Sequence, residues 1–330
     1  MAKERILVTG ASGCIGVWVL KRLLAEDIEI FAWGRNWYRL PWILDRGQEQ
    51  KIHFLEGDIS RPGLVDRHFR RAKPDRVIHL AGMLLPLCRD RPVEGARVNV
   101  IGTLNVFEAA KRFGVRHLAF ASTTSVYGPS EEYEPAPLDN DAPFAARSLY
   151  GAWKIANEYT AKAYWHNDGI SSIGLRPYVV YGAGRDRGLT ATPSVAMLAA
   201  AAGRPYEISY GGRFGFHYAP DVAELFIRAS RADAFQGSET FNLGGDSVTM
   251  AEVVSAIEAA RADAAGRIKW IDVPPPYPPE MHNADLENVL GAIRFSTLRD
   301  AVAETVSLYS RAIERGDIDF DTVAAGASLR

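Results

Sequence analysis

The sequence has few cysteines, no surplus of charge of either sign and no long apolar run. Its 330 residues include only two cysteines, Cys14 and Cys88, which cannot build a disulfide framework. Lysine and arginine number 38 against 40 for aspartate and glutamate, so the chain lacks the basic surplus typical of nucleic-acid binding. The longest apolar helical stretch, Val195 to Ala202, is far shorter than the roughly 20 residues of a membrane span. The chain also starts without the apolar core of a signal peptide. We therefore expect a cytoplasmic protein whose partner is a small molecule, with no membrane or nucleic-acid partner.

Short β-branched segments alternate with longer segments of helical periodicity through the first half of the chain. This alternation is typical of βαβ units and predicts an α/β fold, a Rossmann-type doubly wound parallel sheet. The predicted strands are Arg5–Thr9, Glu29–Trp33, His53–Glu56, Arg76–Leu80, His117–Ser122 and Ser171–Leu175, and the predicted helices are Ile15–Glu26, Ala96–Phe113 and Leu149–Asn167.

The pattern changes after Tyr181, where a loop rich in Gly and Arg is followed by one predicted helix, Pro193–Gly203, and later by a proline cluster. This part of the chain predicts a smaller C-terminal substrate-binding lobe. A helix at Asp221–Ala232 and a strand at Glu239–Leu243 are expected to return to the main sheet. The predicted domains are therefore a dinucleotide-binding Rossmann domain, 1–180 rejoined by about 219–245, and a substrate-binding lobe, 181–218 and 246–330.

A glycine-rich turn joins the first predicted strand to the first predicted helix. Gly10 permits the tight turn, Gly13 lets the backbone approach a pyrophosphate, and Gly16 lets the helix pack close to the strand. The position of this turn inside a βαβ unit predicts a dinucleotide site.

The end of the second predicted strand bears on the choice of cofactor. It carries no carboxylate for the ribose 2′-hydroxyl of NAD, whereas Arg35, with or without Arg39, can pair a 2′-phosphate. The absence of a carboxylate and the presence of Arg35 favour NADP over NAD. The alternative is that Arg35 is a solvated loop residue and that the ribose of NAD bonds to the main chain. Asp58, after the third strand, either accepts a hydrogen bond from the adenine amine or caps the next turn.

Tyr150 and Lys154 lie one helical turn apart on one face of a predicted helix. A phenolate near neutral pH requires about 4 kcal/mol relative to a free tyrosine. A lysine charge at about 4 Å supplies roughly that much. The pair is therefore sufficient for general acid and base chemistry. Four hydroxyl residues at the end of the fifth strand, Ser122 to Ser125, lie where α/β proteins form ligand sites, and one of them is expected to orient a substrate oxygen.

Taken together, several motifs resemble the extended short-chain dehydrogenase/reductase family, which contains sugar-nucleotide epimerases and dehydratases. They are Thr9-Gly10-x-x-Gly13-x-x-Gly16, His79-Leu80-Ala81-Gly82, Val98-Asn99-x-x-Gly102-Thr103, Ser122–Gly128 and Tyr150-x-x-x-Lys154. The resemblance implies that Tyr150 is the acid/base, that Lys154 lowers the pKa of Tyr150 and holds the nicotinamide ribose, and that Thr123 orients the substrate. It also implies a homodimer that pairs through helices Ala96–Phe113 and Leu149–Asn167.

The resemblance and the preceding arguments give two sets of expected contacts, and no metal-ligand spacing is evident. The residues expected at the cofactor are Gly10, Ser12, Gly13, Cys14, Ile15, Gly16, Arg35, Asp58, Ile59, Leu80, Ala81, Gly82, Asn99, Ser122, Tyr150, Lys154, Pro177 and Val180. The residues expected at the substrate are Met83, Leu84, Thr123, Thr124, Tyr150, Arg185 and His217.

Three departures from the family pattern bear on the reaction. Thr124 and Ser125 stand where dehydratases and decarboxylases carry acids, which disfavours elimination and decarboxylation. Phe214 stands where sugar-nucleotide members tend to carry an arginine for the diphosphate, and Arg213 is expected on the opposite face of its strand. The turn Met83–Cys88 is more apolar than a set of sugar hydroxyls requires.

The sequence therefore leaves three hypotheses. The first is an NAD(P)-dependent oxidoreductase that transfers hydride reversibly at a secondary alcohol or ketone of a small sugar-like or hydroxy-acid substrate, with NADP preferred. The second is a sugar or nucleotide-sugar epimerase with tightly bound NAD. The third is a non-catalytic dinucleotide-binding regulator, against which the presence of Thr123, Tyr150 and Lys154 together argues.

Overall fold

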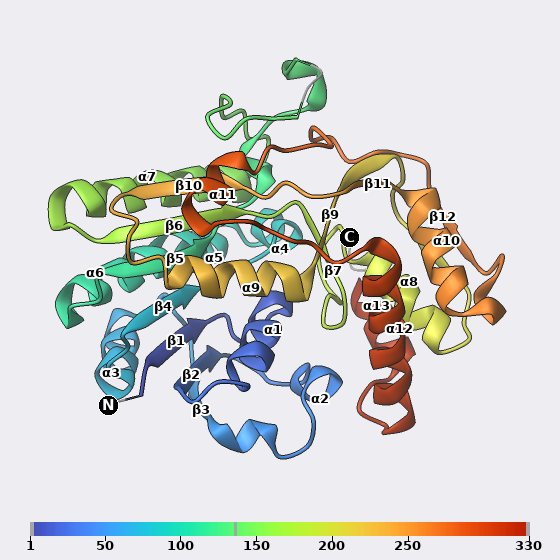
Figure 1. The fold of residues 1–330 in the computed structure, drawn as a ribbon, viewed down its shortest axis with the longest axis horizontal. Coiled ribbons are helices and arrows are strands. Elements are labelled where there is room, and N and C mark those ends of the chain that lie inside the picture. Colours follow the sequence, from blue (N-terminus) through green and yellow to red (C-terminus); the bar gives the residue numbers. More distant parts are fainter. Residues whose placement is uncertain (1–2, 135–136, 328–330) are drawn as a thin grey trace.

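A computed structural model describes residues 3–134 and 137–327 of the chain (Figure 1). Residues 1–2, 135–136 and 328–330, which belong to the predicted domain ranges, lie outside the described residues. The described part contains a large parallel sheet covered by helices on both faces and a second group of short strands and helices. Among the described residues, no helix combines the length and apolar character that a membrane crossing requires.

The large sheet has seven strands, all parallel, in the order β10-β6-β5-β4-β1-β2-β3. Its topology is that of a Rossmann-type doubly wound fold, so the predicted fold class is confirmed. All six predicted strands belong to it, and β10 joins its edge beside β6, as the sequence predicted for the segment Glu239–Leu243. The strands are β1 (Arg5–Thr9), β2 (Glu29–Gly34), β3 (Ile52–Glu56), β4 (Arg76–His79), β5 (His117–Ala121), β6 (Ser171–Arg176) and β10 (Ser238–Asn242).

Helices bury both faces of this sheet, which explains why its central strands are almost continuously apolar. Alternate residues of β1 point to opposite faces. Ile6 and Val8 pack in one core with α1 (Cys14–Leu23) and α9 (Ala219–Ser230). Leu7 packs in the other core, beneath α3 (Pro62–Ala72), α6 (Gly102–Phe113) and α7 (Leu149–Asp168).

The helices between these strands differ from the prediction in more than one place, since α3 was not predicted. The single helix predicted at Ala96–Phe113 is divided into the end of α5 (Pro92–Ala96), a π-helical segment η2 (Arg97–Ile101) and α6. The other short elements are α2 (Leu40–Ile43), η1 (Gln48–Lys51), α4 (Leu85–Asp90), η3 (Thr124–Val126) and η4 (Ser130–Glu132).

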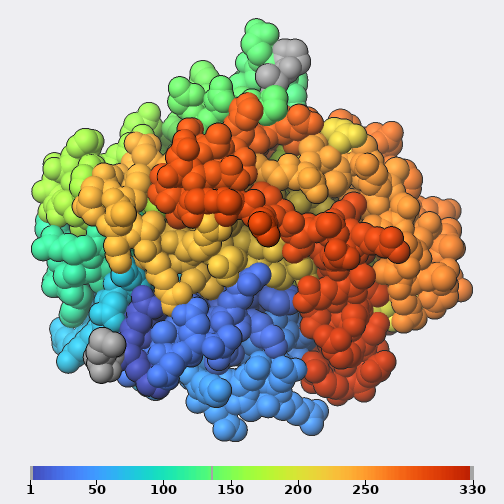
Figure 2. All heavy atoms as spheres, in the orientation of Figure 1, coloured from blue at the N-terminus to red at the C-terminus, as the bar shows by residue number. Residues whose placement is uncertain are grey.

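The second group of elements contains more regular structure than the sequence predicted. It holds two small sheets, in the orders β11-β9-β7 and β12-β8, together with helices that pack on one another. Figures 1 and 2 show its C-terminal helices against the segment that contains α2. Its elements are β7 (Val179–Tyr181), α8 (Thr192–Ala201), β8 (Tyr206–Ile208), β9 (Arg213–Tyr218), β11 (Ser247–Thr249), α10 (Met250–Ala260), η5 (Ala262–Ala264), β12 (Ile268–Trp270), α11 (Ala284–Leu290), α12 (Leu298–Glu314) and α13 (Phe320–Ala327). The exact division of the chain into two domains stays a prediction.

Candidate active site

The glycine-rich turn lies at the carboxyl edge of the sheet, between β1 and α1. Gly10 has a φ of +68°, and a Cβ there would lie 2.5 Å from the backbone nitrogen of Ala81. A Cβ on Gly16 would lie 2.4 Å from the carbonyl oxygen of Gly10, so only glycine permits this packing of α1 on the turn. The first N–H groups of a helix lack partners within it and attract anions. The turn that begins at Gly10 and continues through Gly13, Cys14, Ile15 and Gly16 therefore fits a dinucleotide pyrophosphate.

Residues near the end of β2 surround the other side of the turn. Arg35 is exposed and forms no ion pair among the described residues. Arg39 is instead held by Asp186, with Nη2 2.6 Å from Oδ1, and its Nη1 donates to the Ser12 carbonyl over 2.9 Å. This corrects the expectation that Arg39 is free to assist Arg35 at a 2′-phosphate, because its charge is already neutralised. Asp58 Oδ1 accepts from the backbone N–H of Ser60 over 2.9 Å, so one carboxylate oxygen caps the turn beside Ile59.

The turn after β4 is fixed by Asn99. Its Oδ1 accepts from the Met83 N–H over 2.9 Å, and its Nδ2 donates to the Met83 carbonyl over 3.1 Å. A Cβ on Gly82 would lie 3.0 Å from Asn99 Oδ1 and 3.8 Å from Lys154 Nζ. Asn99 therefore fixes the backbone of Met83 next to Gly82, whereas the N–H groups of Leu80 and Ala81 donate to Thr9. The sequence did not predict this role of Asn99.

Tyr150, Lys154 and Thr123 converge where α7 begins beside the end of β5. Ser148 caps α7, with its Oγ accepting from the Gly151 N–H over 3.1 Å. A Cβ on Gly151 would lie 2.0 Å from the carbonyl oxygen of Ser125, so this glycine permits the close approach of the helix to the end of β5. The Thr123 hydroxyl lies close enough to the Tyr150 phenol to lower its pKa, and it also accepts from the Ser125 N–H over 3.2 Å. The structure thus brings the three predicted catalytic residues together.

The electrostatics of this group are dominated by burial. Burial raises the pKa of the Tyr150 phenol to about 12, and the Arg185 guanidinium is the strongest influence that opposes the rise. Burial also lowers the pKa of Lys154 to about 8, against the influence of the Cys88 thiol and Glu158. The Lys154 ammonium donates to the Ala121 carbonyl over 2.6 Å. That Lys154 lowers the pKa of Tyr150 stays a prediction. The structure instead shows Arg185 as a positive charge that lowers this pKa.

A buried ion pair that the sequence analysis missed supports the end of β5. Glu158 of α7 binds Arg176 of β6 through two hydrogen bonds of 2.9 and 2.7 Å, and both side chains are buried. The Ser122 hydroxyl donates to Glu158 Oε1 over 2.5 Å. Ser122, which was expected at the cofactor, is therefore tied to this pair in the protein interior.

The residues predicted at the substrate do not all gather at Tyr150. Met83 is buried, and Leu84 lies against the loop of Gly188. Thr124 is buried, and its N–H donates to the Pro177 carbonyl over 3.3 Å.

His217 lies on β9 at the register of Val180 and is buried. Its Nδ1 accepts from the Tyr178 N–H over 3.1 Å, and its Nε2 lies 3.0 Å from the Gly244 carbonyl oxygen. This corrects its expected substrate role, because both ring nitrogens are already bonded to backbone.

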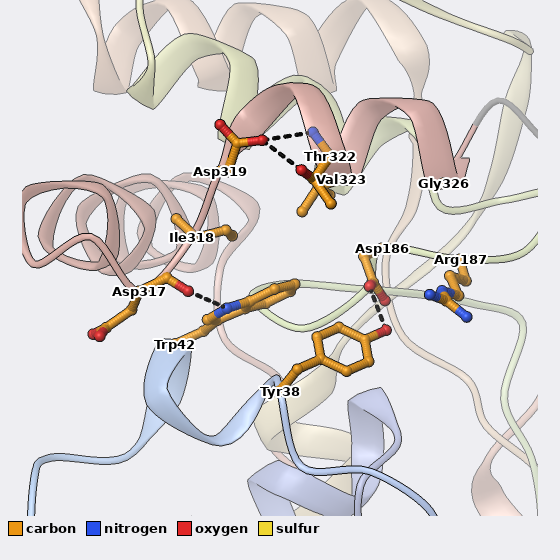
Figure 3. A pocket seen from close by; sticks show the side chains of 10 residues that line it. All are labelled: Tyr38, Trp42, Asp186, Arg187, Asp317, Ile318, Asp319, Thr322, Val323 and Gly326. Carbon is orange, nitrogen blue, oxygen red and sulfur yellow. Dashed lines mark hydrogen bonds between the residues drawn. The ribbon is translucent and has the colours of Figure 1, made fainter.

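One cavity of the structure is lined by residues other than Tyr150. It measures about 220 Å³ and lies between the loop after β2, the loop after β7 and the C-terminal residues (Figure 3). In it, the Tyr38 hydroxyl donates to Asp186 over 2.8 Å and the Trp42 indole donates to the Asp317 carbonyl over 3.1 Å. No group of three His, Cys, Asp or Glu side chains within 3–134 and 137–327 is arranged to hold a metal ion.

Comparison with known proteins identifies the class to which this fold and site belong. The model of the NAD dependent epimerase/dehydratase family matches residues 6–244. The UDP-glucose 4-epimerase of Mycolicibacterium smegmatis is 30% identical over 323 residues, which cover 92% of this chain and 98% of that protein. The chain belongs to the NAD-dependent epimerase/dehydratase family, of the extended short-chain dehydrogenase/reductase type, and is an enzyme. The predicted family and the enzyme prediction are thereby confirmed.

Solved structures agree with this assignment. The UDP-glucose 4-epimerase of Thermus thermophilus in complex with NAD superimposes with a TM-score of 0.76 and 25% identity, covering 92% of this chain and 98% of that chain. The L-threonine dehydrogenase of Clostridium difficile superimposes with a TM-score of 0.79 and 20% identity, covering 94% of this chain and 99% of that chain. The second likeness shows the shared fold alone.

Proposed function

We propose that this enzyme is a dehydrogenase or reductase that transfers hydride reversibly at a secondary alcohol or ketone of a small sugar-like or hydroxy-acid substrate. The observation that carries the proposal is the arrangement at the end of β5. Thr123 meets Tyr150 there, and the next two residues, Thr124 and Ser125, carry hydroxyls in place of acids. Elimination and decarboxylation require an additional acid or base. Hydride transfer with a single proton exchange requires only the groups present.

In this proposal Thr123 orients the substrate oxygen and Tyr150 exchanges its proton. A substrate hydroxyl gives its proton to the Tyr150 phenolate during oxidation, and the phenol returns it to the carbonyl oxygen during reduction. The Arg185 charge lowers the pKa of the phenol, against the effect of burial. In the proposal the Lys154 ammonium, 5.7 Å from the ring centre of Tyr150, adds to this effect. The nicotinamide ring, when bound, supplies the hydride acceptor or donor.

The surroundings of the site support a small substrate over a nucleotide sugar. Phe214, which stands at the position of the family's diphosphate-binding arginine, is fully buried. Arg213 is exposed and donates to the Ser247 carbonyl over 2.7 Å, consistent with its predicted outward direction. In the segment after Gly82, Met83 is buried and the partly exposed Leu84 is apolar.

The family is NAD-dependent, and we propose that this member prefers NADP. Arg35 directly follows β2, is exposed and is free of carboxylate partners in the described part of the chain. A guanidinium in this position suits a 2′-phosphate, and β2 ends without a carboxylate that would bind the ribose hydroxyl of NAD.

An epimerase with tightly bound NAD is the second candidate. The relative from Mycolicibacterium smegmatis, a UDP-glucose 4-epimerase, is similar over almost its whole length. An epimerase uses the same Thr, Tyr and Lys groups but retains its cofactor through the cycle.

One experiment separates these two functions. The purified enzyme is denatured and the released nucleotide is identified by mass spectrometry, and in parallel NADP⁺ and NAD⁺ reduction is assayed with a panel of sugar acids and polyols. The proposal predicts little retained nucleotide and turnover that depends on added cofactor. Stoichiometric retained NAD, with isomerisation of a UDP-sugar in the absence of added cofactor, would replace the proposal with the epimerase.

We also propose a homodimer. Large apolar side chains are exposed on neighbouring helical segments, namely Ile101 on η2 and Leu149 and Tyr159 on α7. Because exposed apolar side chains on neighbouring helices can mark protein contacts, these helices suit pairing with a second copy of the chain. The cytoplasmic location stays a prediction.

A further inference from the structure

Arg185, in the loop between β7 and α8, holds a charge that the described part of the chain does not neutralise. Its Nε is buried and has no hydrogen-bond partner. Its Nη2 donates to the Thr190 hydroxyl over 3.1 Å, and no described carboxylate forms an ion pair with it. Arg185 is partly buried, and a buried donor without a partner is unfavourable unless a ligand accepts its hydrogen bond.

The neighbouring residue shows that the same loop does neutralise another arginine. Asp186 accepts from Arg39 Nε over 2.8 Å and from the Tyr38 hydroxyl over 2.8 Å. Figure 3 shows Asp186 and Arg187 beside Tyr38, in the cavity described above. The only carboxylate adjacent to Arg185 in the sequence is thus committed elsewhere, and Arg185 keeps its free donor.

The contacts of Arg185 place it at the catalytic group. Its charge lowers the pKa of Tyr150, which burial otherwise raises. A Cβ on Gly188, whose φ is +102°, would lie 3.2 Å from both Arg185 Nη2 and Leu84 Cδ1. The guanidinium therefore lies beside Leu84, on the predicted substrate side of Tyr150, and the bare backbone of Gly188 leaves room for it.

We propose that Arg185 binds a carboxylate of the substrate and that the substrate is a hydroxy acid or its keto acid. This inference rests on the proposed function, because it takes Tyr150 as the group that faces the reacting carbon. The planar guanidinium offers Nε together with an Nη for a bidentate carboxylate, and Thr190 fixes its orientation. Leu84 then packs against the carbon chain between the carboxylate and the reacting alcohol.

The test measures binding of matched acids and polyols without turnover. L-Lactate, D-erythronate and D-gluconate are titrated by calorimetry into enzyme saturated with NADPH, and propane-1,2-diol, erythritol and D-glucitol are their neutral counterparts. Hydroxy acids cannot react with the reduced cofactor, so the titration reports binding alone. At least one acid is expected to bind tenfold or more tightly than its polyol, and Arg185→Gln is expected to abolish that preference.

Arg187→Gln is the matched control, because Arg187 is exposed in the same loop and its guanidinium lies over Tyr38, 5.6 Å from the ring centre. It is expected to keep the preference. Arg185→Lys keeps the charge but loses the planar fork, and a reduced preference is expected. This variant also serves if Arg185→Gln does not fold.

Two results would overturn the inference. One is the absence of an acid preference in the unmodified enzyme. The other is an unchanged preference in the Arg185 variants, and if these variants also bind NADPH at least tenfold more weakly, the anion is a phosphate of the cofactor.

Failure of the proposed function has a different signature. An enzyme that binds the acid through Arg185 but does not oxidise it with NADP⁺ or NAD⁺ supports the carboxylate site and contradicts the dehydrogenase. Tyr150→Phe is expected to bind the acid as the unmodified enzyme does, because its role lies in proton exchange.

Discussion

Lys154 Nζ lies 5.7 Å from the ring centre of Tyr150 and donates a hydrogen bond to the Ala121 carbonyl. This bond offsets part of the free energy that the ammonium loses when it leaves water. Burial lowers the pKa of Lys154 from 10.5 to about 8. The folded protein therefore holds this charge at neutral pH at the expense of its own stability.

Lys154→Met is expected to raise the free energy of unfolding at pH 7 by about 1–3 kcal/mol while lowering turnover at least about 100-fold. Because the folded pKa is the lower one, the unfolded chain binds more protons between about pH 8 and 10.5. The free energy of unfolding of the unmodified enzyme therefore rises as the pH increases from about 8 to 10.5. The difference in this free energy between the variant and the unmodified enzyme becomes smaller over the same range. Urea unfolding at pH 7 and pH 10.5 measures both effects. The exposed Lys162→Met is the control, and a destabilised Lys154→Met would contradict the account.

Glu158→Gln is expected to destabilise the protein by about 3–5 kcal/mol, because it leaves the buried Arg176 without its counter-ion. Glu239→Gln removes the partner of an exposed pair with Lys162 and is expected to change stability by about 0.5 kcal/mol or less. Equal losses in the two variants, measured by chemical unfolding, would show that the buried pair has no special role.

Arg35→Gln is expected to lower kcat/KM for NADP⁺ by about 10- to 100-fold and to leave that for NAD⁺ nearly unchanged, because a charge-assisted hydrogen bond to the 2′-phosphate is lost. Arg46→Gln, another exposed arginine after β2, is expected to change neither value. Steady-state kinetics with both cofactors provide the measurement. A parallel loss with both cofactors would argue against recognition of the 2′-phosphate.

If the enzyme is the proposed homodimer, Tyr159→Arg is expected to convert it to a monomer, because this side chain on α7 is 62% exposed within the proposed contact surface. Val273→Arg is the control, since Val273 is 59% exposed and lies far along the chain in the C-terminal region. Sedimentation velocity gives the mass of each. A monomeric unmodified enzyme, or a dimeric Tyr159→Arg, would remove the proposed dimer surface.

The strands and the grouping of the three residues proposed as catalytic were predictable because their signals are local. The apolar segment Arg5–Thr9 followed at once by Gly10 specifies a buried strand and a tight turn, and the spacing of Tyr150 and Lys154 fixes them on one helix face. By contrast, α12 (Leu298–Glu314) was missed because no motif pointed to it, although Thr297 caps its start.

The remaining site features depend on partners distant in the sequence. Arg39 and Asp186 are 147 residues apart, so their pairing could not be inferred from either segment alone. His217 suited a substrate role by residue type, but its ring is bonded to the backbone of two other segments. The environment of Arg185 likewise emerges only when the loop after β7 meets the turn after β4.

The most direct test of the account is the turnover of Tyr150→Phe with the alcohol that the unmodified enzyme oxidises fastest. The account predicts a loss in kcat of about 100- to 10,000-fold, with cofactor binding and the free energy of unfolding unchanged, because only the proton-exchanging hydroxyl is removed. Turnover within tenfold of the unmodified enzyme in a folded variant would contradict the assignment of Tyr150 as the acid and base.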